Sequence, residues 1–107
     1  MKNSLLVLAV IALGAAPLAI AKGNAEAGKA KSTTCAACHG AEGVSAVSSF
    51  PKLAGQHRDY LYHALKDYQS GKRKNPLMAE QVKSLTDADL HDLALYFSQQ
   101  KGLTLKY

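Results

Sequence analysis

The stretch that decides the interpretation of this chain is Cys35-Ala36-Ala37-Cys38-His39, which contains both of its cysteines. Two thiols separated by two residues can lie on a single helical turn, within reach of the two neighbouring vinyl groups of one haem. The histidine that follows falls beneath the porphyrin ring, where its imidazole can bond the iron. Because C-x-x-C-H is a specific signature of haem attachment, it predicts one haem bonded covalently to Cys35 and Cys38, with His39 on the iron.

Other uses of the two cysteines are weaker alternatives. A zinc site would need two further ligands at a paired spacing, whereas the remaining histidines are scattered along the chain. A thioredoxin-like dithiol would need a βαβ pattern around it, which the sequence lacks. A disulfide between Cys35 and Cys38 would close too small a loop to stabilise the fold much. The remaining histidines are His57, His63 and His91.

Met78 is predicted to hold the opposite side of the iron. Apart from Met1 it is the only methionine of the chain, and it lies in Asn75-Pro76-Leu77-Met78, which we expect to be an irregular stretch between two helices. A thioether is a soft ligand that favours ferrous iron and raises the reduction potential. The alternative is a methionine that fills a gap in the core.

The other three histidines are not expected to bind the iron. His57 shares an apolar stripe with Leu61, so we expect a packed or surface side chain there. His63 and His91 lie off the apolar faces of their predicted helices and should be solvated. None has the position directly after a paired cysteine that His39 has.

Residues 1–21 have the pattern of a secretory signal peptide. Lys2 gives a basic start, residues 5–13 form an uninterrupted apolar run, and Ala19-Ile20-Ala21 is a small-x-small cleavage site. An uncleaved membrane anchor is the alternative, but 17 residues interrupted by Gly14 and Pro17 are short of the roughly 20 that a span needs. We therefore expect residues 22–107 to form the exported domain, without stable membrane insertion after cleavage.

The predicted domain is small for the core that it must build. It has 86 of the 107 residues, no tryptophan, and 12 basic against 8 acidic side chains, a formal charge of +4. Chains of this length are near the lower limit for a sufficient hydrophobic core. A bulky apolar cofactor would fill the interior, as disulfides or metals do in other small domains. Export and the lack of a basic-aromatic surface pattern argue against nucleic acid as a partner.

The periodicity predicts an all-α domain with three main helices. The first covers residues 25–31 with Asn24 as its N-cap, and the second covers residues 56–70 and stops at Gly71. Thr86 caps the third, whose aspartates are expected to favour its positive end. A short extra turn is possible over residues 79–83. The apolar face of the third helix is Leu90, Leu93, Ala94 and Phe97, and its aspartates are Asp87, Asp89 and Asp92.

Together these motifs resemble the class I cytochromes c, and in particular small bacterial monohaem members related to the dihaem cytochrome c-four group. The resemblance covers nearly all of residues 22–107 and implies the class I cytochrome c fold, with three main helices and loops wrapped around one covalent haem. The chain has one haem motif, so the resemblance does not extend to a two-haem relay. The matching stretches are residues 35–39, 51–57, 71–73, 75–78, 85–87 and 93–97.

The resemblance also implies roles for individual residues. His39 and Met78 would be the axial ligands, and the carbonyl of Pro51 would accept a hydrogen bond from the free ring nitrogen of His39. Leu53 would pack against the haem. Gly28 on the first helix would allow Tyr96 on the last to pack against it. The candidate donors to the haem propionates, which the sequence leaves unranked, are Gln56, Arg58, Tyr60, Arg73 and Asn75.

The function that follows is that of a soluble periplasmic carrier, which passes one electron by outer-sphere transfer at the haem edge and catalyses no reaction. Redox proteins would be its partners, and Lys72-Arg73-Lys74 could steer one with an acidic face, or be simply a solvated loop. A monomer is expected. The alternatives are a haem subunit of a larger periplasmic oxidoreductase and, less favoured, a gas-binding haem protein with a vacant sixth position.

Overall fold

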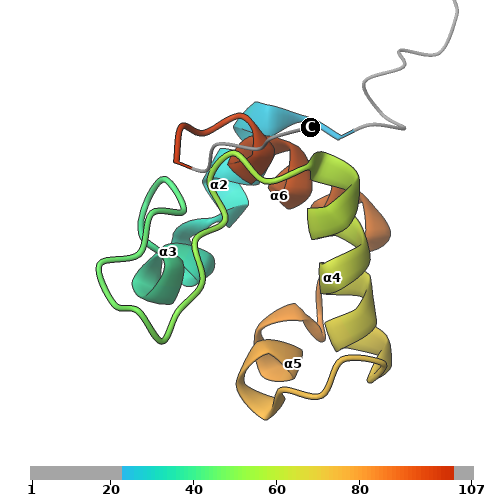
Figure 1. Ribbon diagram of the computed structural model, residues 1–107. Helices are drawn as coiled ribbons and strands as arrows, with labels where there is room; N and C mark the ends of the chain where they lie inside the picture. Colours follow the sequence, from blue (N-terminus) through green and yellow to red (C-terminus); the bar gives the residue numbers. More distant parts are fainter. Residues whose placement is uncertain (1–22, 103–107) are drawn as a thin grey trace, which may run out of the picture.

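The computed structural model describes residues 23–102, so the predicted signal peptide over residues 1–21 lies outside the described part of the chain. Within that part the protein contains helices and no strand, which confirms the all-α prediction. The helices form an arc, with α3 at one end and α5 at the other (Figure 1). Their bounds are α2 Ala25–Lys31, α3 Thr33–His39, α4 Arg58–Ser70, α5 Pro76–Val82 and α6 Asp87–Ser98.

The first and last described helices pack closely against each other at Gly28. A Cβ atom at this position would lie 2.1 Å from the backbone oxygen of Asp92 and 2.8 Å from Cβ of Tyr96. Any side chain larger than hydrogen would therefore push α2 away from α6, which run side by side in Figure 1. The predicted contact between Gly28 and Tyr96 is confirmed, and it lets the backbones of the two helices approach directly.

Asp92 joins the same two helices through polar contacts. Its carboxylate accepts hydrogen bonds from the backbone N–H of Asn24 at 2.8 Å and from Nζ of Lys31 at 2.6 Å. Lys31 also pairs with Asp89 at 2.6 Å, and the two carboxylates raise the pKa of the Lys31 ammonium, with Asp89 the larger influence. The prediction that Asp92 serves as a helix-end charge is therefore corrected. It is a buried link between α2 and α6, made by residues 61 and 68 positions apart.

The hydrophobic core forms where α6 packs against α4. The predicted apolar face of α6 is buried, and Leu61 of α4 meets it. Burial of one large apolar side chain stabilises a fold by about 1.5–3 kcal/mol, so this small cluster provides much of the available stabilisation. The buried members of the cluster are Leu61, Leu93, Ala94, Tyr96 and Phe97.

Two helices differ from the sequence prediction at the centre of the chain. The second predicted helix begins at Arg58 rather than at residue 56, because His57 has the extended ψ of 132° that a helix-capping position requires. The extra turn predicted over residues 79–83 is the helix α5, which begins earlier, at Pro76. Met78 therefore lies in the first turn of a helix and not in an irregular stretch. The helix α3 contains the paired cysteines and adds a fifth helix to the described chain.

The three remaining histidines differ in their exposure. His57 and His63 are exposed, as a surface location predicts. The prediction for His91 is wrong, because its side chain is only 25 % exposed and its ring stacks on Tyr62 with centroids 4.0 Å apart. Within residues 23–102, no helix combines the length and apolar character needed to cross a membrane.

Candidate haem site

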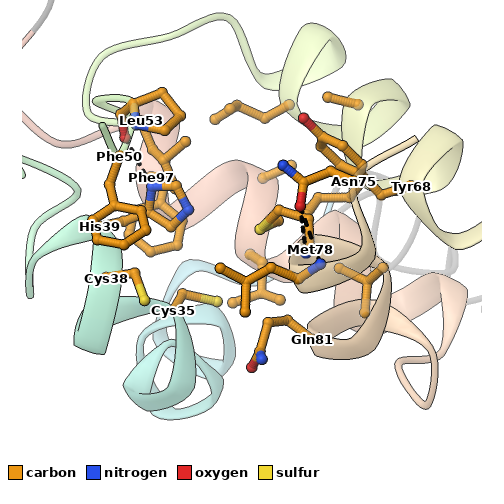
Figure 2. Close-up of a pocket in the computed structure, with 18 of the residues that line it drawn as sticks. Cys35, Cys38, His39, Phe50, Leu53, Tyr68, Asn75, Met78, Gln81 and Phe97 are labelled. Carbon is orange, nitrogen blue, oxygen red and sulfur yellow. Dashed lines mark hydrogen bonds between the residues drawn. The ribbon is translucent and has the colours of Figure 1, made fainter. Parts of the chain in front are cut away.

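A cavity of about 510 Å³ occupies the centre of the fold. This volume lies within the range of about 300–1,000 Å³ that is usual for cofactor sites. Figure 2 shows Cys35, Cys38 and His39 on one side of the cavity and Met78 on the other. Four residues that the sequence singled out for one cofactor, from two parts of the chain, therefore line a single cavity.

The side that we call the attachment wall consists of Cys35, Cys38 and His39 on α3, together with Pro51. α3 begins at Thr33, directly after α2, and Ser32 joins the two helices by donating a hydrogen bond from Oγ to the carbonyl of Lys29 at 2.7 Å. The spacing of three residues places both thiols on the same helix face, toward the cavity. The α2–α6 packing thus fixes the position of the thiols.

The Cys35 thiol lies in an apolar environment. It packs against the hydrophobic cluster of α4 and α6, and burial raises the pKa of the thiol above its usual value. Cys35 therefore lies at the apolar side of the cavity, where a bound porphyrin would meet the core.

His39 has one ring nitrogen committed to the protein. It is the last residue of α3, is 6 % exposed, and its Nδ1 lies 2.8 Å from the carbonyl oxygen of Pro51. A carbonyl can only accept, so Nδ1 carries the proton and donates this bond. The hydrogen bond fixes the tautomer and the ring orientation, and it leaves Nε2 available as a metal ligand. The contact between His39 and Pro51 that the resemblance implied is thus present.

The opposite side, which we call the methionine wall, consists of Asn75 and the first turn of α5. Asn75 is the N-cap, and its Oδ1 accepts hydrogen bonds from the backbone N–H groups of Leu77 at 3.1 Å and Met78 at 3.2 Å. Pro76 occupies the first helical turn, where its missing N–H costs nothing. The side chain of Met78 points across the cavity toward the ring of His39 (Figure 2). The cap therefore orients the residue that carries the thioether.

The remaining lining of the cavity combines apolar side chains with several polar ones. Leu53 lines it, as predicted, beside Leu61, Leu93 and Phe97. Such a lining holds a porphyrin and keeps water from it. Four of the five candidate propionate donors also line the cavity, whereas Arg58 does not and pairs with Asp59 at 2.8 Å instead. The four are Gln56, Tyr60, Arg73 and Asn75.

Arg73 and Lys52 supply positive charge to the lining of the cavity. The guanidinium of Arg73 lies 4.8 Å from the ring centroid of Tyr68, and a hydrogen bond with Tyr60 raises its already high pKa. Lys52 lines the same cavity and was not singled out from the sequence. Its place directly after Pro51, whose carbonyl fixes His39, is the signal that could have revealed it.

The donor set fits haem and fits other metals poorly. Two thiols, an imidazole and a thioether around a largely apolar cavity are the groups that attach haem and bind its iron from both sides. No cluster of three or more His, Cys, Asp or Glu side chains with metal-binding geometry occurs within residues 23–102. The zinc alternative therefore has no structural support in the described chain.

Comparison with known proteins gives the same assignment. The family described as Cytochrome c matches residues 25–101. Cytochrome c4 of Pseudomonas aeruginosa is 48 % identical over 92 % of this chain and 49 % of its own length. Cytochrome c-554(548) of Halomonas halodenitrificans is 40 % identical over 74 % of this chain and 99 % of its own length. The crystal structure of reduced recombinant cytochrome c4 from Pseudomonas stutzeri matches with a TM-score of 0.72 and 44 % identity, over 76 % of this chain and 47 % of that one.

The matches cover different shares of the relatives' own lengths. The chain spans about half the length of the cytochromes c4 that it matches, but nearly the whole length of the protein from Halomonas. The helices, the haem-binding motif and the cavity all lie within the matched residues 25–101. The chain is therefore a member of the cytochrome c family, with the class I cytochrome c fold and haem c as its cofactor.

Proposed function

We propose that this protein is an exported carrier that transfers one electron at a time between redox proteins. Cys35 and Cys38 attach the haem, and His39 and Met78 bind its iron from opposite sides. When bound, the haem supplies an iron that alternates between the ferric and ferrous states. The residues around it fix its position, exclude water and set which oxidation state is favoured.

The observation that carries this proposal is the placement of His39 and Met78 on opposite walls of one cavity. With a protein ligand at each axial position, no coordination site remains for a substrate, so the protein passes electrons and does not transform a bound molecule. The soft thioether favours the ferrous state and raises the reduction potential. A gas-binding protein would need the position that Met78 fills.

Contacts with the protein hold both proposed ligands, which suits electron transfer. The His39 ring is fixed by Pro51, and the backbone of Met78 is fixed by Asn75. Ligands that keep their places in both oxidation states reduce the rearrangement that accompanies each transfer. Polar groups arranged in advance act in the same way at other reactive centres.

Two stretches of the sequence support export and the encounter with redox partners. They are residues 1–21 and the basic stretch Lys72-Arg73-Lys74. The former have the pattern of a signal peptide, which would deliver residues 22–107 to the periplasm. The latter are exposed, and Arg73 also lines the haem cavity. Positive charge beside the cofactor accelerates the encounter with an acidic partner more than it strengthens the complex. Redox encounters of this kind bury little surface, roughly less than 1,200 Å².

Replacement of Met78 tests the axial assignment. In the reduced holoprotein, Met78→Ala should open a coordination position that binds carbon monoxide, and the reduction potential should fall by an amount on the order of 0.1 V. Glu80→Ala is the matched control, because Glu80 is exposed on the same helix and is not among the described residues that line the cavity, so it should change neither quantity.

Two results would contradict the proposal. If the reduced wild-type protein binds carbon monoxide as readily as Met78→Ala does, the sixth position is open and a gas-binding function gains support. If the protein expressed from its own host is recovered only in a stable complex with a second, catalytic chain, it is a haem subunit and not a mobile carrier. Recovery as a monomer that exchanges electrons with several partners supports the carrier.

A further inference from the structure

Gln69 contacts the methionine wall from outside the cavity. It lies near the end of α4 and is not among the described residues that line the cavity. Its Nε2 donates hydrogen bonds to the backbone carbonyl of Val82 at 2.9 Å and to that of Leu85 at 2.7 Å, and both bonds are partly buried. Val82 is the last residue of α5, so this amide holds the end of the helix opposite to the cap at Asn75.

The helix α5 needs such support because it is short. It has seven residues, and isolated helices of fewer than about 12–15 residues are marginal in water. It packs chiefly against α4, whereas α2 and α6 pack extensively against each other. The last carbonyls of a helix have no partner within it, and the carbonyl of Val82 accepts hydrogen bonds from Gln69 and from the backbone N–H of Leu85. The position of α5, and therefore of Met78, depends on few contacts.

Three contacts hold α5 in place. At its start, Asn75 caps the backbone N–H of Met78. At its end, the side chain of Val82 is 2 % exposed and anchors the helix in the core. The third contact is the pair of bonds from Gln69, which also spans the turn from Val82 to Leu85 that leads into α6. A movement of α5 away from the cavity would have to break the Gln69 bonds.

We propose that Gln69 is a positioning residue for the axial ligand Met78: its amide links α4 to the end of α5 and so keeps the thioether on the iron. This inference rests on the proposed ligation by Met78. It predicts that Gln69 controls how often the thioether leaves the iron, although its own side chain never touches the haem. A residue that merely stabilised the fold would change unfolding and leave ligand exchange at the iron unaltered.

The test is carbon monoxide binding to the reduced holoprotein, with denaturant unfolding measured alongside. Gln69→Met keeps the length of the side chain and removes both hydrogen bonds. The fraction of molecules in which Met78 is detached from the iron should therefore rise roughly tenfold, and the apparent affinity for carbon monoxide with it. Gln69→Lys restores a flexible donor that can reach the carbonyls and should return the affinity most of the way to that of the wild type. Gln69→Asn keeps the amide but shortens it by one carbon, and should act like Gln69→Met in a milder form.

Gln100→Met is the matched control. Nε2 of Gln100 donates to the carbonyl of Tyr96 at 3.0 Å, so it also supports the end of a helix, but that helix is α6 and carries no ligand. Its loss should lower stability without changing carbon monoxide binding. The inference is overturned if Gln69→Met and Gln100→Met lower stability alike and neither changes the affinity while Met78→Ala raises it. If Met78→Ala also has no effect, the ligation by Met78 and this inference fall together.

Discussion

The two walls of the haem cavity are built differently. The attachment wall continues directly from α2, which packs against α6 at Gly28 and is bonded to it through Asp92. Its ligand His39 is buried and fixed by Pro51. The methionine wall is a seven-residue helix whose proposed ligand, Met78, is only half-buried and whose position depends on side-chain amides at its two ends.

The difference separates two requirements of a carrier. The thioether bonds and the histidine must stay in place for the lifetime of the protein, and the core that forms around α2 and α6 provides that permanence. In the proposed carrier, the methionine would raise the reduction potential and close the sixth position, and a few local contacts are enough to hold it. We therefore expect substitutions near the attachment wall to affect folding, and those near the methionine wall to affect ligand exchange.

The largest expected effect is at Gly28, where α2 and α6 are in contact. Gly28→Leu would place its side chain against the backbone of α6 and should lower the free energy of unfolding by at least about 3 kcal/mol, or prevent haem attachment during maturation. Gly71→Ala is the control: it has a positive φ of 85° but nothing within 4 Å of an added Cβ, so it should cost only about 1 kcal/mol. Denaturant unfolding of the two holoproteins measures both, and equal losses would contradict the close packing of α2 on α6.

Asp92→Ala should have the next largest effect. It leaves the N–H of Asn24 and the ammonium of Lys31 without their buried acceptor, and should cost about 2–3 kcal/mol in unfolding free energy. Asp59→Ala, at a carboxylate that is 79 % exposed, should cost less than about 0.5 kcal/mol. Carbon monoxide binding should not respond to either change, and a response to Asp92→Ala would show that the two walls are coupled.

A pair of helix caps compares the two walls directly. Asn75→Ala and Asn24→Ala each remove an asparagine that accepts backbone N–H groups at the start of a seven-residue helix. Each should cost about 1 kcal/mol of stability. Only Asn75→Ala should increase carbon monoxide binding to the reduced protein, because Met78 is on the helix that it caps. Equal responses of the two variants would remove the distinction between the walls.

The smallest expected effect is the acid dependence of stability. Hydrogen bonds from Lys31 and from the backbone of Thr86 lower the pKa of Asp89 below its ordinary value of 3.8. A carboxyl group whose pKa is lowered in the folded state stabilises the protein at pH values above its unfolded-state pKa. This contribution is lost as the pH falls through the folded-state pKa. Asp89→Asn should therefore reduce stability at pH 7 by less than about 1 kcal/mol, since the pair is partly exposed. The free energies of unfolding of the two proteins should approach each other as the pH falls below about 3.8. A difference that grows on acidification would contradict the assignment.

Local signals in the sequence predicted most of the fold. The bounds of α2 and the start of α6 follow from caps that adjoin their helices, Asn24 and Thr86, so a short window contains the necessary information. The start of α5 was missed although the same kind of signal was present. Asn75 followed by Pro76 suits both an irregular loop and the first turn of a helix, and only the packing against α4 distinguishes the two.

In the haem site too, the local motifs could be predicted from the sequence and the contacts between distant residues could not. Its two halves were predicted because Cys35, Cys38 and His39 form one motif and Met78 is the only methionine of residues 22–107. The contacts that hold these residues join distant parts of the chain, such as Asn24 with Asp92 and Gln69 with Leu85. Asparagine, aspartate and glutamine have many possible partners, and the tertiary fold alone selects among them.

Covalent attachment of the haem can be tested by the intact mass of the protein after export in a host that matures such cytochromes. The expected mass is that of residues 22–107 plus one haem that denaturation does not release, because thioether bonds to Cys35 and Cys38 hold it. A mass equal to that of the polypeptide alone would contradict covalent attachment, and with it the assignment of the central cavity.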